Sequence, residues 1–322
     1  MITNRRPTTK EDHITFTIPA FNSAITIEES IDSIFNGNFE KGDEVIVVND
    51  GSTDKTKEVV EKLQKKYSGL KLISQENKGC PAARNTAIRE AKNPLIFTLY
   101  SDDILVPGTV SKVKDYLIKK QADMAGFGET HFFYTKKGRK VFTHKFVSIP
   151  GIFTLADFLE GDINPSHGGN YLYTKDIWEK VGGIWEYGKG LHEAWGFTLK
   201  VLANGAKMLV TPGTYYNHRY GYDSLTTKQL RLEDGALMAT KMIEPFLDLL
   251  DKKDAEFLKS YEGSRSWFTS RDRKAIHLKS GEIGHTGKLV IYPKEKIKRS
   301  ILRLLRRIPF VYNKLFPNAK IN

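Results

Sequence analysis

The sequence predicts an α/β fold in which a mostly parallel sheet carries helices on both faces, followed by a mainly helical C-terminal region. In the first hundred residues, short apolar runs alternate with amphipathic helical patterns, which is typical of parallel strands joined by crossover helices. The run at residues 44–48 (EVIVV) is almost wholly apolar, as expected for a strand covered on both faces. From about Thr226 the patterns become mainly helical, which predicts a boundary there.

The elements of the first half follow one another in strand–helix order. We expect strands at residues 13–19, 44–48, 70–74 and 95–99, with helices starting at Thr26, at 54–67 and at 81–91. Thr26 and Glu29 have the spacing of a capping box at the start of the first helix. Asp54 is expected to cap the second helix.

The middle of the chain mixes hairpin, loop and helix patterns. Residues 131–134 and 141–146 flank Lys137-Gly138, which predicts an antiparallel hairpin. We further expect a loop at 162–170, a helix at 197–203, a strand at 207–210 and another at Tyr215-Tyr216. The chain then divides into a first unit, residues 1–225, and a helical region, residues 226–322.

The composition of the chain indicates the cellular compartment in which we expect the protein. The single cysteine, Cys80, excludes an internal disulfide and fits a reducing environment. Residues 1–12 are polar and charged, unlike a secretory signal. No apolar stretch approaches the ~18 residues that a spanning helix needs, so we expect a cytoplasmic protein.

Positive charge is concentrated in the C-terminal region. Residues 1–225 hold 29 Lys and Arg against 27 Asp and Glu, whereas residues 226–322 hold 21 against 11. Residues of about 294–308 (KEKIKRSILRLLRRI) place apolar side chains at helical spacing among basic ones. This pattern predicts a helix on an anionic membrane surface, and hence peripheral association with the inner face of the cell membrane. The alternative is a helix packed on the first unit; no nucleic acid is expected, since no groove-reading module is present.

Acidic side chains follow two of the predicted strands. Asp50 follows the second strand, and Asp102-Asp103 follow the fourth. Ligands of open parallel sheets bind beyond the carboxyl ends of the strands. Adjacent carboxylates repel each other unless a cation lies between them, and a divalent ion prefers oxygen ligands. The acid pair therefore predicts a metal site, with a cap-and-turn role as the alternative.

Four segments in order resemble family 2 glycosyltransferases. They are IPAFN (18–22), VVNDGSTD (47–54), ENKGCPAARNTAI (76–88) and LYSDDILVPG (99–108). The resemblance covers roughly residues 13–110, and more weakly extends to about 220. It implies a GT-A fold, with nucleotide-sugar binding at about 13–110 and the acceptor side at about 125–225.

The resemblance implies a donor site at these strand ends. Pro19, Ala20 and Phe21 match the stretch that lines the base pocket, Asp50 the contact to nucleobase or ribose, and Arg84 the arginine near base and diphosphate. The alternatives are a turn role for Asp50 and a surface ion pair for Arg84. Cys80 is interpreted as a small filler rather than a catalytic group.

The resemblance also implies a divalent metal cofactor, Mn²⁺ or Mg²⁺. Asp103 matches the metal ligand, and Asp102 matches the residue that faces ribose or a metal-bound water. The family often has a further acid where this chain has Tyr100. His218 is a second candidate ligand, because a histidine near that position joins the metal in some relatives.

The family pattern implies inversion by single displacement, which needs a general base for the acceptor hydroxyl. The matching stretch is LHEAWG (191–196), in which Glu193 matches the first acid and Ala194 takes the place of the aspartate that usually acts as base. Three outcomes follow: Glu193 is the base, His192 is the base, or the chain binds donor and transfers poorly. Gly168-Gly169-Asn170 resembles the loop that approaches the donor sugar.

These observations predict an inverting glycosyltransferase. It would move a sugar from a nucleotide diphosphate donor, with UDP favoured, to a glycan or lipid-linked oligosaccharide in the synthesis of bacterial surface polysaccharide such as capsule. One alternative is a nucleotide-sugar- or membrane-binding module without turnover, motivated by Ala194. The other is a sugar-1-phosphate nucleotidyltransferase, which would need a glycine-rich basic loop after the first strand; residues 19–22 (PAFN) stand there instead.

Overall fold

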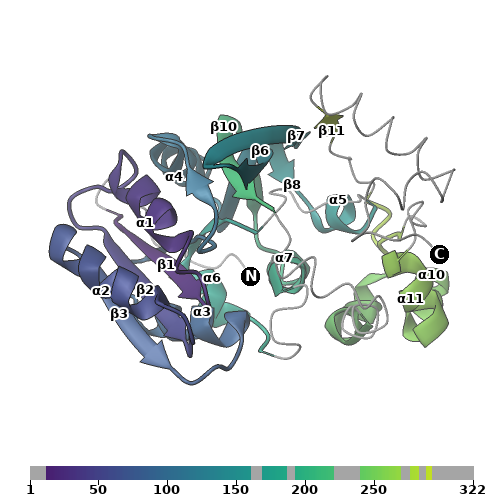
Figure 1. Cartoon of the computed structure of the whole chain (residues 1–322). Helices are drawn as coiled ribbons and strands as arrows, with labels where there is room; N and C mark the ends of the chain where they lie inside the picture. Colours follow the sequence, from purple (N-terminus) through teal and green to yellow (C-terminus); the bar gives the residue numbers. More distant parts are fainter. Residues whose placement is uncertain are drawn as a thin grey trace, which may run out of the picture.

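The computed structural model describes residues 12–160, 169–186, 193–220, 240–269, 276–282 and 288–291 (Figure 1). Its centre is a parallel sheet made of the four strands expected in the first half. They are β1 (Ile14–Ala20), β2 (Glu44–Asp50), β3 (Leu70–Gln75) and β4 (Leu95–Thr98). Their order in the sheet is β4-β1-β2-β3, so β1 has a parallel neighbour on each side.

The same sheet continues with mixed strand directions. β9 (Leu172–Thr174) runs antiparallel to β4, and β6 (Met124–Lys136) and β7 (Arg139–Val147) form the expected hairpin. The long β10 (Met208–Arg219) pairs with β6, with the two-residue β5 (Ile104–Leu105) and with β8 (Gly151–Phe153). β11 (Lys288–Ile291) adds to the edge at β7. The fold is therefore α/β as predicted, with the parallel part confined mainly to the first half.

Helices cover both faces of the parallel strands. α1 (Ile27–Phe35), α2 (Thr56–Lys66) and α4 (Thr109–Lys120) share one core with the inward residues of β1 and β2. α3 (Cys80–Glu90) packs on the opposite face. β2 shows why: Val45 and Val47 belong to the first core, while Ile46 and Val48 contact α3, because successive side chains of a strand point to opposite faces.

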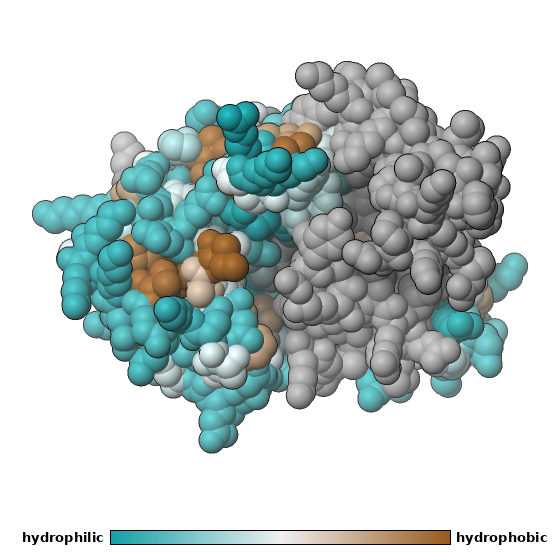
Figure 2. All heavy atoms as spheres, viewed as in Figure 1, coloured by the Kyte–Doolittle hydropathy of each residue, from teal (hydrophilic) through white to brown (hydrophobic). Residues whose placement is uncertain are grey.

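A second core joins the middle of the chain to the described C-terminal helices. It contains residues of α5 (Leu155–Glu160), α6 (Lys175–Lys180), α7 (Glu193–Ala203), α10 (Lys252–Lys259) and α11 (Tyr261–Thr269), and the 3-10 helix η2 (Glu244–Leu249) packs against it. Trp195 and Trp185 pack against this core, with Trp195 5.1 Å from Phe158 between ring centroids, so both rings have structural neighbours. Among the residues coloured in Figure 2, the apolar ones form small separate groups between mainly hydrophilic side chains.

Local predictions at helix starts had mixed outcomes. The capping box was wrong: the Thr26 side chain makes no cap hydrogen bond, and the Glu29 carboxylate pairs with Lys140 and Arg219 instead. Two cations on the β6–β7–β10 layer attract this carboxylate more strongly than one backbone N–H does. Asp54 lies one residue before the N-cap of α2, which is Lys55, but its Oδ1 still accepts from the N–H of Thr56, the first residue of the helix, 2.9 Å away. α7 begins four residues before the predicted start.

Some predictions lie outside the described residues. The boundary near Thr226 and the basic segment at 294–308 are among them, so the division at residue 225 stays a prediction. The described residues from 240 to 269 are mainly helical, as expected. Within the described ranges, we find no helix that combines the length and the apolar character needed to cross a membrane.

Candidate active site

The loops that follow β1, β2 and β4 meet at one edge of the sheet. Ser23 Oγ lies 2.7 Å from Ser101 Oγ, and the N–H of Asn22 donates to Ser52 Oγ at 3.0 Å. Ala20 is buried at the end of β1, whereas the next side chain, Phe21, is 48% exposed. Pro19, Ala20 and Phe21 therefore reach this edge, as the rule for parallel sheets predicts, and Phe21 offers an open aromatic face there.

Asp50 ends β2 and is held by the chain itself. Its Oδ1 accepts from Gln75 Nε2 at 2.7 Å and from the N–H of Lys78 at 3.0 Å, and its Oδ2 accepts from the N–H of Gly79 at 2.8 Å. The residue is 2% exposed. Asp50 thus fixes the loop that leads into α3, while a contact with the nucleobase or ribose stays a prediction.

The acid pair lies at the same edge and its two members are unequal. Asp103 is fully buried and accepts from Asn170 Nδ2 at 2.6 Å and from the N–H of Arg219 at 3.0 Å. Burial, and then the charge of Asp103, raise the pKa of Asp102 to about 7. The charged form of Asp102 is therefore disfavoured, and a cation nearby would favour it again.

His218 is brought to Asp103 from the end of β10. Its Nδ1 lies 3.0 Å from Asp103 Oδ1. Burial by itself lowers the pKa of His218, but the charge and hydrogen bond of Asp103, with the charge of Asp102, raise it above its ordinary value. Arg219 Nε donates to the Asp102 carbonyl at 3.0 Å, which connects the loop of the acid pair to β10. The sequence analysis did not identify Arg219 as part of the site.

Asp102, Asp103 and His218 bring ligand types of a divalent cation to one edge of the sheet, and metal binding by them stays a prediction. Carboxylate oxygens and imidazole nitrogen are suitable ligands for such an ion. The described residues include no group of three or more His, Cys, Asp and Glu side chains arranged to hold a metal by themselves. Oxygens of a bound diphosphate would have to complete the coordination, as is common for Mg²⁺.

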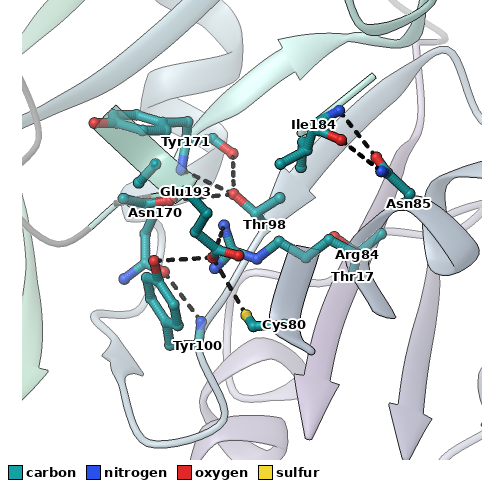
Figure 3. Close-up of polar contacts among 12 residues, drawn as sticks. Thr17, Cys80, Arg84, Asn85, Thr98, Tyr100, Asn170, Tyr171, Ile184 and Glu193 are labelled. Atoms are coloured by element: carbon teal, nitrogen blue, oxygen red, sulfur yellow. Dashed lines mark hydrogen bonds and ion pairs between the residues drawn. The ribbon is translucent and has the colours of Figure 1, made fainter. Parts of the chain in front are cut away.

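A second, buried polar cluster joins α3, α7 and Tyr100, which follows β4 (Figure 3). Arg84 Nη1 of α3 lies 3.1 Å from Glu193 Oε1 of α7, and both side chains are 3% exposed. Cys80 Sγ and Tyr100 Oη each donate to the same Oε1 at 3.2 Å. Arg84 is therefore the buried partner of the predicted base, and its interpretation as a surface ion pair was wrong because α7 covers it.

Three atoms of this cluster have no hydrogen-bond partner within the described part of the chain, although they are buried. They are Nε and Nη2 of Arg84 and Oε2 of Glu193. Burial opposes the charge of Arg84, but the neighbouring Glu193 carboxylate raises the pKa of Arg84 above its ordinary value. Unpaired buried polar atoms cost about 1–3 kcal/mol each, so a polar ligand that reached them would bind favourably.

Cys80 is a neutral member of the cluster. Burial, together with the charge of Glu193, raises the pKa of the Cys80 thiol well above its ordinary value. A protonated thiol is a weak nucleophile, which agrees with the expectation that Cys80 is not catalytic.

The chain packs Ala194 against backbone at the position where the family places an acid. Gly169 has φ +82°, and a Cβ on it would lie 2.5 Å from Ala194 Cβ and 3.1 Å from Tyr100 Oη. Glu193 is thus the acid that the structure describes at this end of α7. His192 lies outside the described residues, so its role as base stays a prediction.

Asn85, next to Arg84 on α3, connects this helix to the segment before α7 (Figure 3). Its Nδ2 donates to the Ile184 carbonyl at 2.7 Å and to Glu186 Oε1 at 2.8 Å. Its Oδ1 accepts from Trp178 Nε1 and from the N–H of Ile184, both at 3.0 Å. Asn85 lies in a stretch quoted for the resemblance, yet its sequence gave no sign of this role.

We expect Asn85→Ala to lower the free energy of unfolding by about 2–4 kcal/mol, because it leaves several buried donors and acceptors unpaired. Urea unfolding measures the loss. Arg89→Ala is the matched control, since Arg89 lies on the exposed side of the same helix and donates to Thr86 Oγ1, one turn earlier. Equal losses for the two variants would contradict the role of Asn85.

The fold and the site together define an α/β protein of the GT-A class. The chain belongs to glycosyl transferase family 2, since the model of that family matches residues 15–182. It is 24% identical over 220 residues to the uncharacterized glycosyltransferase EpsJ of Bacillus subtilis, covering 66% of this chain and 62% of that protein. It is 39% identical over 104 residues to chondroitin synthase of Pasteurella multocida, covering 32% of this chain and 11% of that one.

Solved structures show the same fold. S. aureus TarS 1-349 in complex with UDP-GlcNAc matches with a TM-score of 0.60 at 21% identity, covering 80% of this chain and 74% of that chain. A mannosyltransferase from Pyrobaculum calidifontis, in complex with GDP-Man and Mn²⁺, matches with a TM-score of 0.54 at 19% identity, covering 78% and 71%. The match spans less than two thirds of the length of each curated relative named above.

Proposed function

We propose that this protein transfers a sugar from a nucleotide diphosphate donor to a hydroxyl of a glycan or lipid-linked acceptor, with inversion at the anomeric carbon. The observation that carries the proposal is a chain of hydrogen bonds between the acid pair and the Arg84–Glu193 cluster. The N–H of Tyr100 donates to Asn170 Oδ1 at 3.1 Å, and Asn170 Nδ2 donates to Asp103. Tyr100 Oη in turn reaches Glu193. Groups suited to a diphosphate and a group suited to proton transfer therefore share one edge of the sheet.

The residues of the two clusters would have different roles in the transfer. Asp102, Asp103 and His218 would hold Mn²⁺ or Mg²⁺, which neutralises charge on a diphosphate leaving group. Arg84 keeps a fixed positive charge beside Glu193. The acceptor oxygen attacks the anomeric carbon and gives its proton to Glu193 Oε2. The bond between the anomeric carbon and the diphosphate oxygen breaks, and its electron pair leaves with the nucleotide diphosphate.

The proposed donor and acceptor are supported by what the relatives bind and make. UDP is the favoured nucleotide, because the structural neighbour TarS was solved with UDP and with UDP-GlcNAc; the GDP-Man complex keeps GDP as an alternative. Relatives include a poly(ribitol-phosphate) beta-glucosyltransferase and a poly-beta-1,6-N-acetyl-D-glucosamine synthase, so a surface polymer is the proposed product class. The basic segment at 294–308 would bring the enzyme to the inner face of the membrane, where lipid-linked acceptors lie.

A second candidate function is binding of a nucleotide sugar without turnover. It is favoured by one observation, the packing of Ala194 against Gly169 where the family has an acid. Formation of a glycosylated product from a panel of acceptors would exclude it.

Calorimetric titration of UDP, dTDP, GDP and CDP, with and without Mn²⁺, tests the donor site. We expect UDP to bind at least about tenfold more tightly with Mn²⁺ present, because the acid pair would hold the ion and the ion would neutralise charge on the diphosphate. Asp103→Ala should weaken UDP binding and abolish the metal dependence. Asp115→Asn, which changes an exposed acid on α4, should retain it. Absence of binding by every nucleotide would overturn the proposed function.

A further inference from the structure

Tyr100 makes three contacts at the centre of the site, although it stands where the family often has an acid. Its backbone N–H donates to Asn170 Oδ1 at 3.1 Å, and its Oη donates to Glu193 Oε1 at 3.2 Å. The guanidinium carbon of Arg84 lies 4.2 Å from the centroid of its ring. Figure 3 shows the side chain between Asn170 and the Arg84–Glu193 pair.

These contacts make the two oxygens of Glu193 different. Oε1 receives the Arg84 guanidinium, the Tyr100 hydroxyl and the Cys80 thiol, whereas Oε2 has no hydrogen-bond partner in the described ranges. A carboxylate anchored through one oxygen cannot rotate freely, so the other oxygen keeps a fixed direction. Oε2 is buried as well, and of the two oxygens it is the one whose hydrogen-bonding capacity is unused in the described ranges.

A neutral side chain at residue 100 also keeps the ion pair intact. A carboxylate at this position would lie close to the Arg84 guanidinium, which the Tyr100 ring now covers, and would compete with Glu193 for it. It would also add a third negative charge beside Asp102 and Asp103. Tyrosine supplies a hydrogen-bond donor and a cation–π surface without either effect.

We propose that Tyr100 is a positioning residue for proton transfer in this chain. It holds Glu193 through Oε1, leaves Oε2 as the oxygen that can take the acceptor proton, and keeps Arg84 paired with Glu193 rather than with an acid after β4. This inference rests on the proposed function for the role of Glu193 as base. The contacts themselves do not depend on that function.

Tyr100→Phe tests the proposal, because it retains the ring over Arg84 and removes the hydroxyl. We expect kcat to fall about 10–100-fold, the size that a hydrogen bond to a charged group supports, with the donor KM within twofold of the parent value. Tyr100→Asp should lower kcat further and raise the donor KM, since it draws Arg84 away.

The chain offers a matched control in Tyr173. It is fully buried beside Arg84, and its hydroxyl has no hydrogen-bond partner within the described segments. Tyr173→Phe therefore removes a buried hydroxyl that makes no such contact, and kcat should stay within twofold. Equal losses for Tyr100→Phe and Tyr173→Phe, or a loss confined to KM, would overturn the proposal.

A second measurement needs no activity. In a double-mutant cycle of Tyr100→Phe and Glu193→Met, the combined shift of the thermal midpoint should be smaller than the two separate shifts added together. Additive shifts would show that the Tyr100–Glu193 contact is absent and would overturn the inference. An enzyme that shows the coupling but transfers no sugar would instead contradict the proposed function alone.

Discussion

Glu193→Gln is expected to lower kcat for sugar transfer by about 10²–10⁴-fold, the range that a general base contributes. Glutamine has nearly the same shape and can still accept the hydrogen bonds of Tyr100 and Cys80, but it cannot take a proton from the acceptor. The dissociation constant of the nucleotide should change little, because the acid pair is untouched. Transfer rates at saturating donor and calorimetry with UDP measure the two quantities.

Two controls separate the base from its neighbours. Glu179→Gln changes an exposed acid on α6 and should leave kcat unchanged. His192→Ala tests the other candidate base. If His192→Ala abolishes transfer while Glu193→Gln keeps most of it, the assignment of the base moves to His192.

Arg84→Met should lower the free energy of unfolding by about 3–5 kcal/mol, since removing one partner of a buried ion pair leaves the other charge uncompensated. Both side chains of the Arg84–Glu193 pair are 3% exposed, so water cannot replace the lost partner. Urea unfolding followed by circular dichroism measures the change.

The double variant Arg84→Met with Glu193→Gln provides the comparison. It removes both charges, and replacing a whole buried pair is often nearly neutral. We therefore expect the double variant to be more stable than Arg84→Met alone. If the two single losses simply add, the pair is not coupled and the buried contact has been misassigned.

Local signals explain what the sequence predicted well. The four parallel strands follow from short apolar runs, and the meeting of Ala20, Asp50 and Asp103 at one edge follows from the geometry of parallel sheets. The hairpin around Lys137-Gly138 was also predictable, because a turn between two apolar runs is a short-range pattern.

The sequence analysis missed the contacts between residues that lie far apart in the chain. Asn170 clamps Asp103 from 67 residues away, and Arg219 reaches it from 116 residues away, so no spacing rule links them. The predicted Thr26–Glu29 capping box was wrong for the same reason, because the Glu29 carboxylate pairs with Arg219, 190 residues further along. In the sequence, Tyr100 only replaces an acid that the family often has at this position. Its contact with Arg84 in the structure indicates a different role.

The separation between Asp103 and its partners also sets an order of assembly during synthesis. His218 and Arg219 follow Asp103 by 115 and 116 residues. At about 5–20 residues per second, the ribosome adds them roughly 6–23 s after the acid pair. The parallel strands can pair in that interval, but the acid loop cannot be closed. The candidate site of a nascent chain is therefore incomplete until β10 has been synthesised and has joined the sheet.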